Sequence, residues 1–89
     1  MGGEGFTVQM RTASPQLLAF GRTLRKARRD RDLSQEALAD GAGLSAKHVG
    51  EIERANKDPR LTTILKLATA MDMRSSELFG QFDERLDAD

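Results

Sequence analysis

The sequence has no cysteine and a single histidine, His48. Without cysteine there are no disulfides and no thiolate metal sites, and one imidazole argues against a metal site built from histidines. The same absences remove the usual nucleophile–base pairs, and no glycine-rich phosphate loop is present. We therefore expect a protein that is not an enzyme and binds no metal and no cofactor.

Long apolar runs are also missing. No stretch approaches the roughly 20 apolar residues that a membrane-spanning helix needs. The N-terminus lacks the basic-then-apolar order of a signal peptide. We expect a cytoplasmic protein with no membrane partner.

Neither sign of charge is in excess, because 14 Lys and Arg residues face 14 Asp and Glu residues. This balance argues against a protein that holds nucleic acid by bulk charge alone. The distribution is uneven: residues 22–31 carry six basic residues and one acidic residue, whereas residues 82–89 carry four acids and one arginine. We expect a local basic patch that steers a DNA duplex, with the acidic end held away from it.

The chain length suits one small domain, whose core is marginal unless a partner adds buried surface. Residues 1–13 predict a flexible N-terminal arm. The alternation of Phe6, Val8 and Met10 leaves open an arm that pairs with a partner chain or packs on the domain. A helical domain over residues 14–82 and an acidic tail over residues 83–89 complete the expected organisation.

Helical periodicity dominates the domain. Ser14 and Pro15 predict a helix start, because serine caps free amides and proline is tolerated at the first helical position. Apolar residues then recur at spacings of three and four to about Arg31. A fourth helix, with Thr62 as its cap, and a fifth from about Ser75 are predicted further along the chain.

Residues 34–53 predict two short helices joined by a tight turn. Ser34 is a good cap for the first helix, and Gly41-Ala42-Gly43 breaks it. The second begins at Ser45 and turns Val49 and Ile52 inward. Its outer face then carries Lys47, Gly50, Glu51 and Arg54. This is the layout of a helix-turn-helix, whose second helix enters the DNA major groove.

A longer ordered pattern surrounds this motif. It comprises Gly21, Leu24, Arg28, Leu33-Ser34-Gln35, Leu38-Ala39, Gly43-Leu44-Ser45, Ile52-Glu53, Pro59, Leu65, Leu67-Ala68 and Leu78. Over residues 20–79 the sequence resembles the lambda-repressor/Cro-like (XRE) helix-turn-helix family. The resemblance implies an all-α, five-helix lambda-repressor-like DNA-binding domain.

The resemblance also implies where bases are read. The family's base-reading positions fall on Ala46, Lys47, Gly50 and Glu51. Lys47 can donate to guanine, and Glu51 can accept from cytosine N4. The alternative for these two charges is an ordinary salt bridge one turn apart. Close approach to the groove wall and simple tolerance explain Gly50 equally well.

Further positions are expected to hold the DNA backbone or the fold. Gln35 matches a glutamine that bonds a phosphate in the family, and the resemblance implies an ion pair between Arg28 and Glu53. The alternative is two independently solvated charges. The other expected phosphate contacts are Ser45, His48, Asn56, Lys57 and Arg60.

Three residues depart from the family pattern. Asp32 and Asp72 stand where the family usually has a left-handed glycine after the first and fourth helices. Aspartate tolerates that conformation less well than glycine. Ala55 replaces a third glycine, and we expect Asn56 to adopt the left-handed conformation instead.

Apolar residues near the C-terminus predict assembly. We expect a homodimer contact through Met73, Phe79, Phe82 and Leu86. So small a domain has little core left that Phe82 and Leu86 could join. The alternative is a tail that folds back on its own domain.

The expected function is sequence-specific binding of double-stranded DNA by a homodimeric transcriptional regulator, with a pseudo-palindromic operator. Repression by blocking polymerase is the expected mode, because 89 residues leave no second domain for an effector. The alternative is a protein-protein interaction module of the same fold, whose partner would be a protein such as a toxin or a polymerase subunit.

Overall fold

The computed structural model describes residues 14–88, and within them the chain forms helices only. The helices are α2 (Pro15–Asp30), α3 (Gln35–Ala42), α4 (Ala46–Glu53), α5 (Leu61–Ala70) and α6 (Ser75–Ala88). The predicted five-helix, all-α architecture is confirmed for this part of the chain. The arm predicted over residues 1–13 lies outside the described residues.

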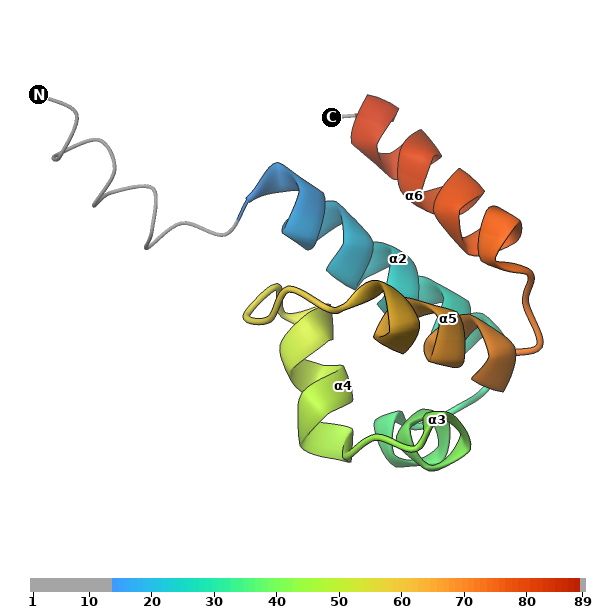
Figure 1. Cartoon of the computed structure of the whole chain (residues 1–89). Helices are drawn as coiled ribbons and strands as arrows, with labels where there is room; N and C mark the ends of the chain where they lie inside the picture. The colour runs from blue at the N-terminus through green and yellow to red at the C-terminus, as the bar shows by residue number, and fades with distance from the viewer. Residues whose placement is uncertain (1–13, 89) are drawn as a thin grey trace, which may run out of the picture.

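Each described helix packs mainly against two others. Helix α6 packs along α2, α4 packs elsewhere on α2, and α3 contacts both α4 and α5 (Figure 1). The largest fully buried apolar side chains are Leu24, Leu38, Val49, Ile52, Leu67 and Leu78. Each such burial contributes about 1.5–3 kcal/mol relative to exposure, so the core holds the helix-turn-helix pair against its neighbours.

Helix α2 begins as the sequence predicts. The Ser14 hydroxyl oxygen accepts a hydrogen bond of 3.0 Å from the amide of Leu17, and Pro15 occupies the first helical position. The helix ends at Asp30, followed by Arg31 as its C-terminal cap. Serine therefore satisfies an amide that the helix leaves free, at a position where proline costs no hydrogen bond.

The turn between α3 and α4 depends on one glycine. Gly41 stays helical, and Gly43 ends α3 with a left-handed φ of 71°. The amide of Leu44 then donates to the carbonyl of Ala39 at 2.8 Å, which closes the helix end. The Ser45 hydroxyl caps α4 by accepting from the amide of His48 at 3.0 Å. The Ser34 hydroxyl caps α3 in the same way by accepting from the amide of Ala37 at 2.9 Å. Two serine caps and one glycine thus fix the geometry of the motif.

Three residues other than glycine adopt left-handed conformations. Asp32 and Asp72, with φ of 55° and 56°, adopt the left-handed conformation at the two positions where the family usually has glycine. Ala55 has φ of 62°, so the prediction that Asn56 would take this conformation is wrong. The reason is local, because left-handed Ala55 brings the amide of Asn56 to the carbonyl of Glu51 at 2.8 Å and closes α4.

The start of α5 also differs from the prediction. The helix begins at Leu61 with Arg60 as its N-terminal cap residue, and no side-chain hydrogen bond caps it. Thr62, the predicted cap, lies within the helix.

Helix α6 is longer and better packed than expected. It continues through residues 83–88, so most of the predicted acidic tail forms its last turns. Phe82 packs against the core, with its ring 5.8 Å from the ring of Phe20 in an edge-to-face contact. Met73 is 6% exposed and belongs to the core. Met73 is therefore not available to a second chain, whereas half-buried Phe82 contributes to the core of its own chain.

Gly21 sets how closely α2 approaches the end of α4. A Cβ atom at this position would lie 2.5 Å from the carbonyl oxygen of Glu53 and 2.8 Å from that of Ile52. These neighbours are backbone atoms, which cannot rotate away as a side chain can. Glycine here brings α2 directly against the C-terminal end of the motif's second helix.

None of the described helices combines the length and the apolar composition needed to cross a membrane.

Candidate nucleic-acid interface

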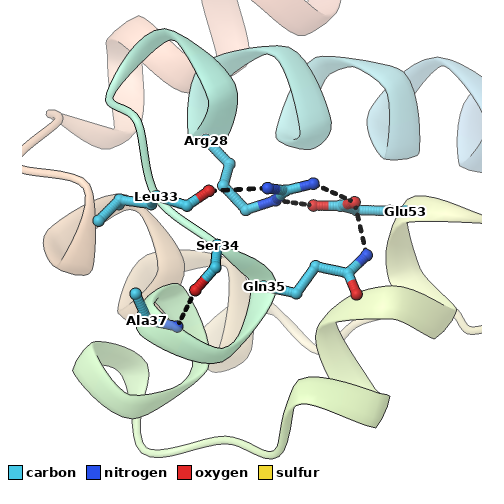
Figure 2. A network of polar contacts seen from close by, with 6 residues as sticks. All are labelled: Arg28, Leu33, Ser34, Gln35, Ala37 and Glu53. Atoms are coloured by element: carbon cyan, nitrogen blue, oxygen red, sulfur yellow. Dashed lines mark hydrogen bonds and ion pairs between the residues drawn. The ribbon is translucent and has the colours of Figure 1, made fainter.

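A buried ion pair joins α2 to the end of α4. Arg28 Nε donates to Glu53 Oε2 at 2.6 Å, and Arg28 Nη2 donates to Oε1 at 3.0 Å (Figure 2). Arg28 is 7% exposed and Glu53 is 8% exposed. The hydrogen bonds with Glu53 raise the pKa of Arg28, burial opposes this rise, and the negative charge of Glu53 adds to it. The two charges are paired rather than solvated.

Gln35, the first residue of α3, extends this cluster. Its Nε2 donates to Glu53 Oε1 at 3.0 Å, while Arg28 Nη1 donates to the carbonyl of Leu33 at 2.7 Å. Figure 2 shows the carbonyl oxygen of Gln35 directed away from Glu53. Sequence reasoning assigned Gln35 to a backbone phosphate and missed this bond. The second N–H of the Gln35 amide is left to donate elsewhere.

The clamp therefore connects the three helices that carry the motif. Glu53 accepts from Arg28 on α2 and from Gln35 on α3, and it is itself the last residue of α4. Hydrogen bonds to charged, buried groups are stronger than those between neutral groups. The orientation of α4 relative to α3 thus rests on a polar cluster as well as on apolar packing.

The outward face of α4 presents a narrow set of side chains. Lys47 is exposed, whereas Ala46 and Glu51 are half-buried. Gly50 is buried, so its predicted place on the outer face is wrong. The Gln35 amide and the Arg54 side chain lie over it. A major groove that received this helix would meet Lys47 first.

Glu51 is paired, but with a different lysine from the one weighed in the sequence. Lys57 Nζ lies 3.7 Å from Glu51 Oε1, and the Lys57 side chain is 52% exposed. Within residues 14–88, Lys47 makes no ion pair. A long, solvent-accessible pair of this kind contributes little to stability. Both charges can therefore exchange partners when another ligand approaches.

The residues expected to hold phosphates surround α4. Ser45 caps the start of the helix and His48, half-buried, lies in its first turn. Asn56, Lys57 and Arg60 are all exposed on the segment that joins α4 to α5. The structure thus brings cations to the C-terminal side of the helix and a polar cap to its N-terminal side.

The basic run that begins in α2 contains both solvent-exposed residues and residues bonded within the fold. Its exposed members are Arg22, Arg25, Lys26 and Arg29. Arg28 belongs to the clamp, and Arg31 donates from Nε to the carbonyl of Met71 at 2.7 Å, which joins the ends of α2 and α5. Sequence reasoning missed this role of Arg31, although its position after the last turn of α2 permits a reach toward another helix end.

Comparison with known proteins agrees with this geometry. A family model described as helix-turn-helix matches residues 24–78. The immunity repressor protein of Bacillus phage phi105 is 31% identical over 64 residues, which cover 72% of this chain and 44% of that protein. The cryptic phage CTXphi transcriptional repressor RstR of Vibrio cholerae is 31% identical over 68 residues, which cover 76% of this chain and 61% of that protein.

A solved structure is also similar. The restriction-modification controller protein C.AhdI from Aeromonas hydrophila superposes with a TM-score of 0.69 and is 48% identical, covering 71% of this chain and 96% of that one. The fold and the exposed helix define a helix-turn-helix domain. The chain belongs to the XRE-type helix-turn-helix family. It spans less than half the length of the phi105 repressor.

Proposed function

We propose that this protein represses transcription by binding a pseudo-palindromic operator as a homodimer. The observation that carries the proposal is the exposed face of α4, held by the buried Arg28–Glu53–Gln35 cluster. Relatives that carry the name repressor support the mode of action. Occupation of an operator excludes polymerase from the same DNA. Because the operator lies with the genome, we place the protein in the cytoplasm.

Base reading in this proposal centres on Lys47. Its exposed ammonium can donate to guanine O6 and N7, while Glu51 can accept from cytosine N4 once Lys57 turns to a phosphate. Ala46 would contact a thymine methyl. Buried Gly50 has no part in this readout. Two polar side chains with different partners give a preference for particular base pairs.

Phosphate contacts would fix the register of α4 in the groove. The exposed cations Lys57 and Arg60 are available on one side, and the amides that begin α3, with Gln35, on the other. Ser45, His48 and Asn56 complete the set that we propose. Such contacts add affinity on every sequence and select none.

Dimerisation is proposed because one short helix reads few base pairs. A second copy doubles the sequence that is read, and linking two half-sites raises affinity through effective concentration. In a twofold dimer the recognition helices lie about 34 Å apart, so half-site centres are separated by about 10 base pairs. This predicts a pseudo-palindromic operator.

We place the dimer contact on α5. Leu61 is 62% exposed and Leu65, one helical turn later, is 40% exposed. Leu61 directly follows the loop from α4, so a contact here joins two copies close to their recognition helices. We propose a second copy of the chain as the partner at this surface, because it also brings a second recognition helix to the paired half-sites. Phe79 and Leu86, expected at the interface from the sequence, are half-buried on α6.

Salt dependence tests the proposal against the main alternative, a protein-binding module of the same fold. Binding to duplex DNA should weaken steeply between about 50 and 200 mM salt, because each phosphate contact releases counterions. Fluorescence anisotropy of a labelled duplex library measures this directly. Affinity that is absent at the lower salt concentration, or that does not change with salt, would reject a DNA-binding role.

A further inference from the structure

Gly50 leaves room for two polar side chains. A Cβ atom at this position would lie 3.0 Å from Arg54 Nη1, 3.5 Å from Gln35 Oε1 and 3.6 Å from Gln35 Nε2. Glycine inside a helix is less favourable than alanine, so its presence in so short a helix needs a reason. The Arg54 guanidinium lies closer to the Cβ position than an ordinary contact allows, whereas the Gln35 amide lies beside it at van der Waals distance.

Arg54 carries a charge that the fold does not use. Its side chain is exposed and makes no ion pair within residues 14–88. Gln35 beside it is fixed, because its amide is bonded to Glu53 and Glu53 is bonded to Arg28. A free guanidinium and an amide that three helices hold in place therefore both lie within 4 Å of the position that a Gly50 Cβ would take.

The neighbourhood has the chemistry of a phosphate site. Arg54, the C-terminal cap residue of α4, offers charged N–H donors, and Gln35, the first residue of α3, has an unused N–H close to the free amides that begin that helix. Arginine binds phosphate through paired, charge-assisted hydrogen bonds. Glu53 does not cancel this charge, because Arg28 already neutralises it.

We propose that Arg54 binds a DNA backbone phosphate together with Gln35, and that Gly50 serves this contact by letting the guanidinium fold back along α4. The inference rests on the proposed DNA-binding function and adds a cation that holds α4 to the backbone from within the motif. The simpler explanation is that Arg54 only favours the C-terminal end of α4 electrostatically. That explanation predicts an effect on stability and none on DNA affinity.

Four variants, each compared with the wild-type protein, test the proposal by duplex affinity over a salt series. Arg54→Gln keeps the length of the side chain and removes its charge. It should weaken binding about tenfold on every duplex and lower the salt slope by about one. Gly50→Ala should weaken binding in the same uniform way although Arg54 is present, because the methyl group displaces the guanidinium. The double variant should bind no more weakly than Arg54→Gln alone, since both changes remove one contact.

Gly80→Ala is the matched control, because a Cβ there meets no atom within 4 Å. Both glycine variants should raise the melting temperature, and only Gly50→Ala should lose affinity. Wild-type affinity and salt slope in Arg54→Gln would overturn the proposal, as would a loss confined to one operator sequence. Additive losses in the double variant would overturn the role of Gly50. A wild-type protein that binds no duplex would instead reject the proposed function and this inference with it.

Discussion

At the scale of single residues, the molecule depends on a charge buried among helices. Arg28 and Glu53 lie almost wholly out of solvent, and Gln35 supplies the third hydrogen bond to the carboxylate. Removing two charges from water is costly, and only close hydrogen bonds offset that cost. The pair therefore specifies how α2, α3 and α4 meet. Removing one partner leaves the other charge buried without a counter-ion.

Replacing Glu53 with alanine tests this view. The variant leaves the Arg28 guanidinium buried without an anion, so the free energy of unfolding should fall by about 3–5 kcal/mol. Urea denaturation followed by circular dichroism measures the change. Glu36→Ala is the control, because Glu36 is exposed in the first turn of α3 and should contribute less than about 1 kcal/mol. Equal midpoints for the two variants would contradict a structural clamp.

At the scale of secondary structure, α6 is the element whose role the structure changes most. It lies along α2 and covers the core with Leu78 and Phe82. The edge-to-face contact between Phe82 and Phe20 joins the last helix to the first described one. The C-terminal segment is therefore part of the domain rather than an extension from it.

Phe82→Ala should destabilise the fold. Phenylalanine-to-alanine changes in a core cost about 3–5 kcal/mol, and half-buried Phe82 should cost roughly half of that. Gln81→Ala, one exposed position away, should change the free energy of unfolding by less than about 0.5 kcal/mol. Thermal unfolding of both variants decides the matter. A dimer that dissociates on Phe82→Ala while each chain keeps its stability would restore Phe82 to an interface.

Local signals in the sequence predict most of this architecture. Ser14, Ser34 and Gly43 act through neighbours within a few positions along the chain, and the structure places each as a cap or turn. The errors fall where a distant element decides. Phe82 has no local partner in the sequence, and only the packing of α6 on α2 buries it.

In the candidate site, too, local signals predict some positions, and distant elements decide the others. Helical spacing turns Lys47 outward without help from other elements. Gly50, one turn away, is covered by Gln35 from α3, which no periodicity within α4 can predict. Glu51 likewise pairs with a lysine in the loop that follows, because left-handed Ala55 reverses the chain after the helix.

At the scale of the whole molecule, the proposed sequence specificity requires two copies of the chain. The described part of one chain presents a single recognition helix of eight residues, about 12 Å long. The exposed pair Leu61 and Leu65 is the surface that we propose for the twofold contact. A dimer contact on α5 and the contact on α6 expected from the sequence predict different effects of a charge introduced on each helix.

Charges introduced on the two helices separate these surfaces. Leu61→Glu should convert the dimer to a folded monomer that binds the operator more than tenfold more weakly, because two half-sites are no longer linked. Leu86→Glu should leave the dimer intact. Sedimentation velocity at micromolar concentration measures the assembly state. Dissociation caused by Leu86→Glu alone would place the contact on α6, and a wild-type monomer with and without DNA would remove dimerisation from the proposal.

Base reading by α4 is the central claim, and the contrast between Lys47→Ala and Arg60→Ala tests it most directly. We choose Arg60 rather than Lys57 as the control for a phosphate contact, because Lys57 is paired with Glu51. Affinities for a selected operator and for its single-base variants should show that Lys47→Ala costs about 1–3 kcal/mol on the operator and relaxes the preference at one base pair per half-site. Arg60→Ala should weaken every duplex equally and lower the salt slope by about one. Uniform losses for both variants would contradict base reading by this helix.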